Sequence, residues 1–424
     1  MSSRLEELSS GIFGRGAISY LFAFAGISLS SFAFHLIVIR LLGPAHYGVM
    51  GSLLGIIGLL TVPIGATQIA VTQAVLAKKA QGQSFSLLSI SSRSLVAGIV
   101  AMLLLFASTS AIDSYLRINS PVPMYLVAIW VPLATVSAIL QGALIGAYQF
   151  RPVAFATFVG SGIIRLVLGV AMVEFGLSVS GAVSATIFAQ TFTLISLAFS
   201  ARHELFGQHH ASTIHTKMRD TALSVAALTG YTTLISIDTF LARHFFSSVP
   251  AGKYAAVAVM AHIAFFVPTA IVAVAFPHLV EGKGVSETSR KIFRQTLQIS
   301  LLLGISAAGT MAIFPVTVVN LFGSAYSSAA NLVGILSLAS VALGTMILFV
   351  YLHLARRSPA ALMPWVGVLL TTLLIYLFHE SIRSLALIML LVSVVTMLLA
   401  IAPVFFKGSG SDRHGDISDP TISS

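Results

Sequence analysis

Two charged residues of this chain lie deep inside long apolar stretches. Arg165 stands in GSGIIRLVLG, about 13 residues after Pro152, and Asp238 stands in YTTLISIDTFLARHF, about 16 residues into its stretch. A helix rises about 1.5 Å per residue, which would place these groups about 20 Å and about 24 Å along their helices. If the helices cross a membrane, a central arginine costs about 2.5–3.5 kcal/mol, so such side chains are expected to face protein or a wet cavity.

These residues, and a histidine in the same setting, each allow a functional and a structural interpretation. Arg165 suits an anionic substrate group such as phosphate, which a guanidinium binds with a planar fork of donors; a structural partner for a carboxylate or backbone carbonyls is the equal alternative. Asp238 suits a cation- or proton-linked switch that pairs with Arg165 in one state, or else an interfacial residue near Arg243 that helps to end its helix. His262 lies about ten residues into its stretch. It is expected to be a buried neutral histidine with one hydrogen bond, with proton coupling as the alternative.

Two prolines interrupt apolar stretches at corresponding places in the two halves of the chain. Tyr47 opens one stretch and Pro63 breaks it, whereas Tyr254 opens the other and Pro268 breaks it. The tyrosines are 207 positions apart and the prolines 205, just under half of the 424 residues. This offset indicates two lobes built on one plan, and proline-interrupted helices at matching places favour a hinge beside a transport path. A passive structural kink is the alternative.

The elements that position these residues are predicted to be membrane-spanning helices. The chain is 57% hydrophobic and only 8% charged, whereas a globular chain is about 25% charged. Apolar runs of roughly 20 residues recur throughout, the length needed to cross a hydrocarbon core, and helices satisfy their own backbone there. The basic residues behind the +10 net charge are scattered over loops. That pattern sets membrane topology, so nucleic acid is not expected as a partner.

The sequence lacks the common motifs of catalysis. It contains no cysteine, which excludes thiolate catalysis and cysteine metal sites. It also contains no phosphate-binding glycine loop followed by lysine and no H-E-x-x-H, the usual marks of nucleotide and zinc sites. No catalytic residue, metal or cofactor is therefore expected, and the chain is predicted to be a transporter rather than an enzyme.

Twelve spans are predicted, six in each half, giving an all-α membrane protein. They cover about 16–39, 47–76, 87–108, 121–147, 153–175, 177–201, 221–245, 252–280, 292–314, 327–354, 359–378 and 384–406. Seventeen basic residues then fall on the side of the N-terminus and five on the other, which predicts that both termini are cytoplasmic. Because each half has an even number of spans, the two should be related by a pseudo-twofold axis along the membrane normal.

The expected organisation has four parts. They are an N-terminal six-helix lobe at 1–201, a cytoplasmic connector at 202–217, a C-terminal six-helix lobe at 218–407 and a cytoplasmic tail at 408–424. The tail has too little apolar content to fold, so it is predicted to be disordered. No loop is long enough to hold a domain, so the function is expected within the membrane, between the lobes.

Three segments carry a resemblance to a known family: RLLGPAHYGVMGSLLGIIGLLTVPIGATQ, IDTFLARHFFSSVPAGKYAAVAVM and LFGSAYSSAANLVGILSL. On these residues the chain resembles the oligosaccharide and polysaccharide flippases of the multidrug/oligosaccharidyl-lipid/polysaccharide (MOP) exporter superfamily. The resemblance implies a MATE-like fold of two lobes around a central cavity lined largely by the first, second, seventh and eighth helices. It also implies alternating access and basic cavity residues that attract substrate phosphates. Arg165 is the only basic residue deep in any span of this chain.

The resulting hypothesis is an inner-membrane flippase that moves a lipid-linked oligosaccharide or polysaccharide precursor from the cytoplasmic to the outer leaflet. Its expected partners are this lipid-linked glycan, membrane lipids and a glycan polymerase or glycosyltransferase. A cation-coupled multidrug-type exporter of the same superfamily is the first alternative, with Asp238 carrying the coupling. An integral-membrane glycan polymerase or ligase and a non-transporting scaffold are the others.

Overall fold

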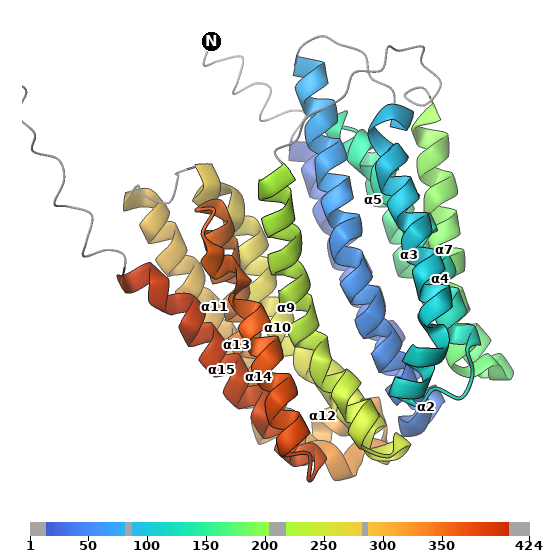
Figure 1. Cartoon of the computed structure of the whole chain (residues 1–424), viewed down its shortest axis with the longest axis vertical. Helices are drawn as coiled ribbons and strands as arrows, with labels where there is room; N and C mark the ends of the chain where they lie inside the picture. The colour runs from blue at the N-terminus through green and yellow to red at the C-terminus, as the bar shows by residue number, and fades with distance from the viewer. Residues whose placement is uncertain (1–13, 81–86, 203–217, 282–286, 407–424) are drawn as a thin grey trace, which may run out of the picture.

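A computed structural model describes residues 14–80, 87–202, 218–281 and 287–406, and the elements in these ranges are helices. Figure 1 shows them as two groups that stand side by side. The N-terminal helix group contains α2 (Gly14–Ala80), α3 (Leu87–Leu116), α4 (Val122–Gly146), α5 (Phe150–Thr157), the π-helix η2 (Phe158–Ile164), α6 (Arg165–Met172), the π-helix η3 (Val173–Leu177) and α7 (Ser178–Ser200).

The C-terminal helix group follows from residue 218. It contains α9 (Met218–Phe245), α10 (Ser248–Glu281), α11 (Glu287–Ile313), α12 (Pro315–Phe322), the 3-10 helix η4 (Ser324–Leu332), α13 (Val333–Ala355), the 3-10 helix η5 (Pro359–Leu362), α14 (Met363–Leu377) and α15 (Ile382–Phe406). The side chains of 265–281 in α10 lie outside the described residues.

The longest helix, α2, is two arms joined at a glycine. Gly43 has φ 66° and ψ 173°, a combination that is essentially restricted to glycine. Pro44 follows directly; it has no N–H to bond, so it suits the first turn of the second arm. Pro63 lies farther along this arm without leaving helical φ and ψ. The bend of α2 therefore lies at Gly43, and a hinge at Pro63 stays a prediction.

Nine stretches of the described residues are long and apolar enough to cross a membrane. Two of them, Ala25–Ala77 and Phe150–Ser200, are more than 50 residues long and bend at the positive-φ residues Gly43 and Gly176, so each is long enough for two crossings. Together with α10, of 34 residues, this agrees with a multi-pass membrane protein. The number of crossings, twelve, stays a prediction, and α3 reaches Leu116 rather than the predicted 108.

Backbone landmarks recur between the two groups at offsets of 206 and 209 positions, close to the offset found in the sequence. Arg117 ends α3 with φ 52°, and Gly323, 206 positions later, ends α12 with φ 132°. Tyr148 after α4 has φ 65°, and Arg357 after α13 has φ 51°. These pairs agree with an internal duplication, although the predicted axis between the groups stays a prediction.

Small residues let α2 approach the C-terminal helix group very closely. A Cβ added at Gly48 would lie 3.0 Å from the Cα of Gly252 in α10, and one at Gly252 would overlap the carbonyl oxygen of Pro44. Close approach of two helices at glycines is typical of packing within membranes. We call this end of the molecule the Gly43 end; α12, which Arg40 of α2 contacts, lies at this lower end in Figure 1, and the C-terminal end of α15 lies away from it.

The contact continues along α2 beyond Gly48. A Cβ at Gly51 would lie 3.1 Å from Ala255, one at Gly55 would lie 2.7 Å from the ring of Phe240, and one at Gly58 would lie 3.5 Å from Thr232. At Gly65 an added Cβ meets no atom of the described residues within 4 Å. The two helix groups are therefore in contact from Gly48 to Gly58 of α2, and Gly65 lines a cavity within the N-terminal helix group.

Two arginines join the groups at the Gly43 end by capping helix C-termini. Arg40 of α2 donates from Nε to the carbonyl of Leu321 in α12, at 3.0 Å. In the reverse direction, Arg243 of α9 donates to the carbonyls of Leu116 (2.9 Å) and Arg117 (2.8 Å) at the end of α3. The last carbonyls of a helix have no partner within the helix and carry its negative dipole end, which favours a guanidinium there. Each group thus contributes one cation to the other.

Candidate functional site

Arg165 begins α6, directly after the π-helix η2, and it is partly buried. Its Cζ lies 4.6 Å from the ring centroid of Phe34 in the first arm of α2, close enough for a cation–π contact. Its Nε is buried and has no hydrogen-bond partner among the described residues. The arginine is held against an aromatic ring, and one of its donors is left unused by the protein.

Asp238 is buried in the C-terminal helix group and has partners of its own. Its Oδ2 accepts a hydrogen bond from the hydroxyl of Tyr254 at 2.8 Å, and its Oδ1 accepts one from the N–H of Thr239 at 2.7 Å. Asp238 and His262 line the same cavity of about 10 Å³, room for about one water molecule. The structure therefore brings these two predicted residues together. A pair between Asp238 and Arg165 stays a prediction for another state.

The two prolines predicted as hinges are described unequally. Pro63 is exposed and its carbonyl accepts a hydrogen bond from the Thr67 hydroxyl at 3.1 Å, one way in which a membrane helix satisfies a carbonyl freed by proline. Pro268 falls in the part of α10 whose side chains lie outside the described residues. Their matched role stays a prediction.

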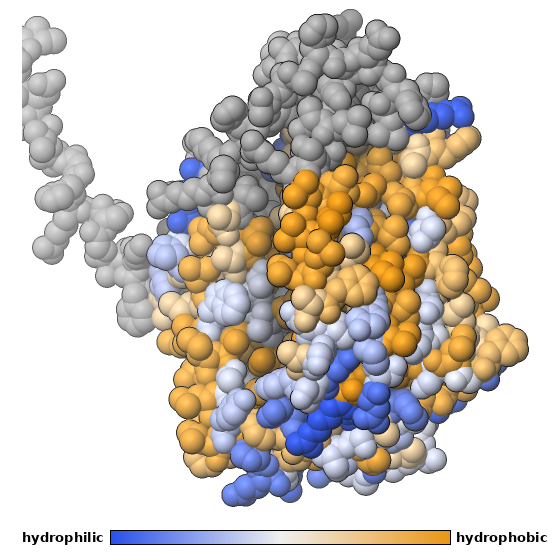
Figure 2. All heavy atoms as spheres, turned by 45° about the vertical axis from the view of Figure 1, so that its right-hand side comes forward, coloured by the Kyte–Doolittle hydropathy of each residue, from blue (hydrophilic) through white to orange (hydrophobic). Residues whose placement is uncertain are grey.

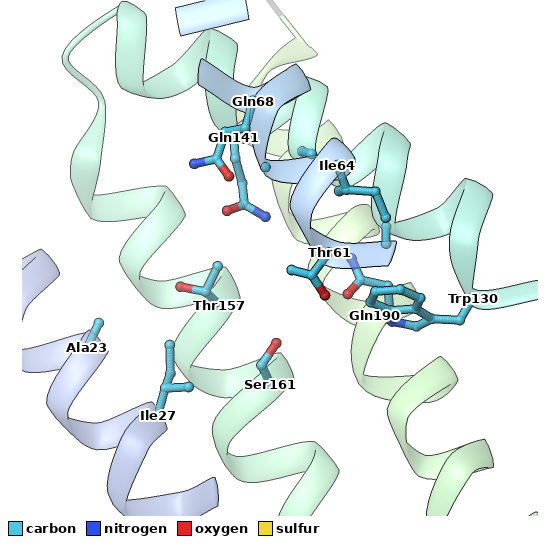
Figure 3. Close-up of a pocket in the computed structure, with 13 residues that line it drawn as sticks. Ala23, Ile27, Thr61, Ile64, Gln68, Trp130, Gln141, Thr157, Ser161 and Gln190 are labelled. Carbon is cyan, nitrogen blue, oxygen red and sulfur yellow. The ribbon is translucent and has the colours of Figure 1, made fainter. Parts of the chain in front are cut away.

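A cavity of about 440 Å³ opens within the N-terminal helix group, where the face of α2 is free. Both arms of α2 line it together with α4, α5, η2 and α7, and Figure 3 shows the side chains around it. Six of the lining side chains are polar and uncharged: Thr61, Gln68, Gln141, Thr157, Ser161 and Gln190. Trp130 and small or aliphatic residues complete the wall, and none of the described residues that line this cavity is charged.

The polar groups of this cavity converge from different elements. In Figure 3, Gln68 and Gln141 lie beside one another at one end, while Thr157 and Ser161 point towards the same open space from another helix. The Thr157 hydroxyl already donates a hydrogen bond to the carbonyl of Val153 at 2.7 Å. We call this site the carboxamide cavity. It can exchange hydrogen bonds of both directions with a ligand, because a carboxamide is donor and acceptor at once.

These glutamines are not among the residues predicted from the sequence, because they carry no charge. Each is a lone polar residue in an apolar helix, and such residues in a membrane usually face the bundle interior. That signal exists for Gln68, Gln141 and Gln190 individually. Their convergence does not, because it depends on how α2, α4 and α7 pack.

Comparison with known proteins assigns the family. Residues 37–331 match the family model described as polysaccharide biosynthesis protein, which is well over half of the chain. The chain belongs to this family. No curated protein sequence matches it.

Solved structures similar to this family member are transporters of the MOP superfamily. A multidrug resistance MATE family transporter in an inward-facing conformation has a TM-score of 0.71 at 14% identity, with 90% of this chain and 94% of that one covered. The lipid II flippase MurJ in an inward closed conformation has a TM-score of 0.66 at 12% identity, with 91% and 87% covered. A MOP superfamily transporter from Pyrococcus furiosus has a TM-score of 0.64 at 15% identity, with 93% and 95% covered. The polysaccharide biosynthesis protein described here has this fold.

The carboxamide cavity differs in position from the central cavity that the resemblance implies. It is lined by both arms of α2, which are the first two predicted spans, but otherwise by α4, α5, η2 and α7 instead of α9 and α10. Part of α10 that would face a central passage lies at 265–281, where side chains are outside the described residues. The central cavity therefore stays a prediction, and the carboxamide cavity is an addition to it.

Proposed function

We propose that this protein is an inner-membrane flippase that moves a lipid-linked oligosaccharide or polysaccharide precursor from the cytoplasmic to the outer leaflet. Membership of the polysaccharide biosynthesis family and the MOP fold support a role in glycan transport. The excess of basic residues on the side of the N-terminus supports cytoplasmic termini.

The observation that carries the proposal is a contact between the two helix groups through small residues and helix ends, formed by a helix that also lines a cavity. The groups meet through Gly48, Gly252 and the two arginines at the Gly43 end, and α2 lines the carboxamide cavity farther along, at Gly65. Alternating access needs such an arrangement, with contacts that close one end and can be exchanged for contacts at the other.

Charge supports a division of tasks during transport. Arg165 has a donor, Nε, without a hydrogen bond to the described residues. It lies on the same helical rod as Ser161 of the carboxamide cavity, where the rod is the continuous helical segment 150–177 formed by α5, η2, α6 and η3. A diphosphate would bring acceptors for this guanidinium, while the glycan would use uncharged groups. Rocking of the groups would then expose both to the outer leaflet.

The test is flipping in liposomes. The purified protein is reconstituted with a short polyprenyl diphosphate disaccharide that carries a nitrobenzoxadiazole label, and dithionite bleaches the label on the outside. We expect the protected inner fraction to become accessible faster than in protein-free liposomes. A phospholipid with the same label controls for general scrambling; equal rates for the two lipids, or no acceleration, would reject the proposal.

A cation-coupled multidrug-type exporter is the second candidate, favoured by the buried Asp238 and its hydrogen bond to Tyr254. Intramembrane carboxylates commonly serve ion or proton pathways. This candidate predicts efflux of an amphipathic cation such as ethidium from whole cells, driven by a sodium or proton gradient and lost in Asp238→Asn. Gradient-independent accumulation of ethidium would exclude it.

A further inference from the structure

We infer that the carboxamide cavity is a subsite for an uncharged sugar unit of the transported glycan, an inference that rests on the proposed function. It deepens that proposal by stating which part of the substrate binds where. The chemistry required is that of hydroxyl and acetamido groups without formal charge.

Burying the three glutamine carboxamides of this cavity costs free energy unless they form hydrogen bonds. No hydrogen bond from the carboxamides of Gln68, Gln141 or Gln190 to another described residue is present. Burying an amide without a partner costs roughly 2–7 kcal/mol in an apolar medium, so these groups must meet water or a ligand. A cavity of about 440 Å³ has room for either, and it falls within the range of small-molecule sites, about 300–1,000 Å³.

The hydrogen-bonding groups and the indole that line the carboxamide cavity suit the chemistry of a sugar. Each hydroxyl of a sugar ring can donate and accept hydrogen bonds, and carboxamides and hydroxyls of the protein can bind to it in both ways. Trp130, only 8% exposed, adds an indole to the wall, which offers an apolar face for the C–H side of a ring and one N–H donor. The open space lies between these groups in Figure 3.

The uncharged lining of the carboxamide cavity disfavours a charged ligand. A phosphate or carboxylate in this cavity would be buried with no cation among the described lining residues, and burying an unpaired charge is far more costly than burying a hydroxyl. Arg165 belongs to the same rod as Thr157 and Ser161, but its guanidinium is placed over Phe34 and it does not line the cavity. The anionic part of the substrate is therefore recognised elsewhere.

Trp130 allows binding to be measured without transport. The chain has two tryptophans, so Trp365→Phe leaves Trp130 as the sole indole reporter in full-length protein in detergent. Four probes are titrated: cellobiose and N-acetylglucosamine, which are neutral, and glucuronate and inorganic diphosphate, which are anionic. We expect a saturable change in Trp130 emission with a neutral sugar and none with the anions. Saturation by an anion alone, or no saturable response to any probe, would overturn the inference.

The chain offers a matched pair of variants for filling the cavity. Gly65 lines the carboxamide cavity and Gly309 lies in α11, and an added Cβ at either meets no atom of the described residues within 4 Å. Leucine is also a better helix former than glycine, so neither variant is expected to impair folding. Gly65→Leu should abolish the sugar response and Gly309→Leu should leave it intact. A response that survives Gly65→Leu would place the sugar outside this cavity.

A conservative variant tests the hydrogen bonds themselves. Gln141→Leu keeps the approximate volume in α4 and removes one carboxamide, and we expect binding of the neutral sugar to weaken by about fivefold. Unchanged affinity would contradict the role of the carboxamides. The readout is separate from flipping: sugar binding without flipping would reject the transport proposal and keep the subsite, whereas flipping without a Trp130 response would reject the subsite alone.

Discussion

At the scale of single residues, Arg165 has more donors than partners. Its Nε is buried without a hydrogen bond among the described residues, and its clearest contact is the Phe34 ring. An unsatisfied buried donor costs stability. It persists more readily where a site is built for a ligand than where it is built for stability.

Arg165→Met should separate stability from function. Methionine keeps an unbranched side chain against Phe34 and removes the unpaired donor. The free energy of unfolding in detergent should therefore stay equal or rise by up to about 1 kcal/mol, which is seen as an equal or higher melting temperature. Flipping in liposomes should fall by at least tenfold. Arg151→Met, at an exposed position, is the control and should flip normally; a strongly destabilised Arg165→Met would indicate a structural role instead.

The bond between Tyr254 and Asp238 should be important for stability. The hydroxyl of Tyr254 donates to the buried carboxyl at 2.8 Å, and both residues are almost fully buried. Tyr254→Phe should lower the free energy of unfolding by about 1–3 kcal/mol, because the carboxyl loses a partner that water cannot easily replace. Tyr125→Phe, at a 39% exposed tyrosine, should change it little. Thermal unfolding of the two variants in the same detergent compares them directly.

The sequence allowed the depth of these residues to be predicted but not their partners. Counting residues along apolar spans predicts how far along their helices Arg165 and Asp238 lie, since helix rise is fixed; their depth in a membrane stays a prediction. Phe34 and Tyr254 lie on other helices, so only packing brings them near. Gln141 was not predicted as a site residue, because an uncharged amide in an apolar helix is a weaker sequence signal than a charged side chain.

At the scale of elements, the elbow of α2 depends on one glycine. Gly43→Ala should cost about 1–3 kcal/mol, since φ 66° with ψ 173° is strained for any side chain. The cost should come from the backbone alone, because an added Cβ at Gly43 meets none of the described residues within 4 Å. Gly309→Ala, equally uncrowded but with helical φ, should be neutral or slightly stabilising. Thermal unfolding measures both, and equal melting temperatures would contradict the argument.

Helix positions were more predictable than helix geometry. Apolar runs predicted elements close to α4, α9 and α15, because the length and polarity of a run are visible in the sequence. The π-helix η2 has no comparable signal, and it lies directly before Arg165. A π-turn holds an additional residue, so it changes which way Arg165 points, and side-chain directions on this rod could not be read from helical periodicity.

At the scale of the whole molecule, the two helix groups share a buried apolar core, and several of their polar contacts are ones that water can replace. Gly48 and Gly252 meet through backbone, and Arg40 and Arg243 each bond to carbonyls at the end of a helix. When such groups separate, water can take over every one of these hydrogen bonds. This favours an interface that opens over one that is permanently packed.

A disulfide across this interface should stop transport. The chain has no cysteine, so Gly58→Cys with Thr232→Cys introduces the only pair; a Cβ at Gly58 lies 3.5 Å from Cγ2 of Thr232, so the two side chains face each other across the interface. Oxidation should reduce flipping to the protein-free rate, because α2 and α9 could no longer separate, and reductant should restore it. The single variants should flip normally under both conditions. Full flipping with the disulfide formed would mean that these groups need not part, and alternating access at this interface would be wrong.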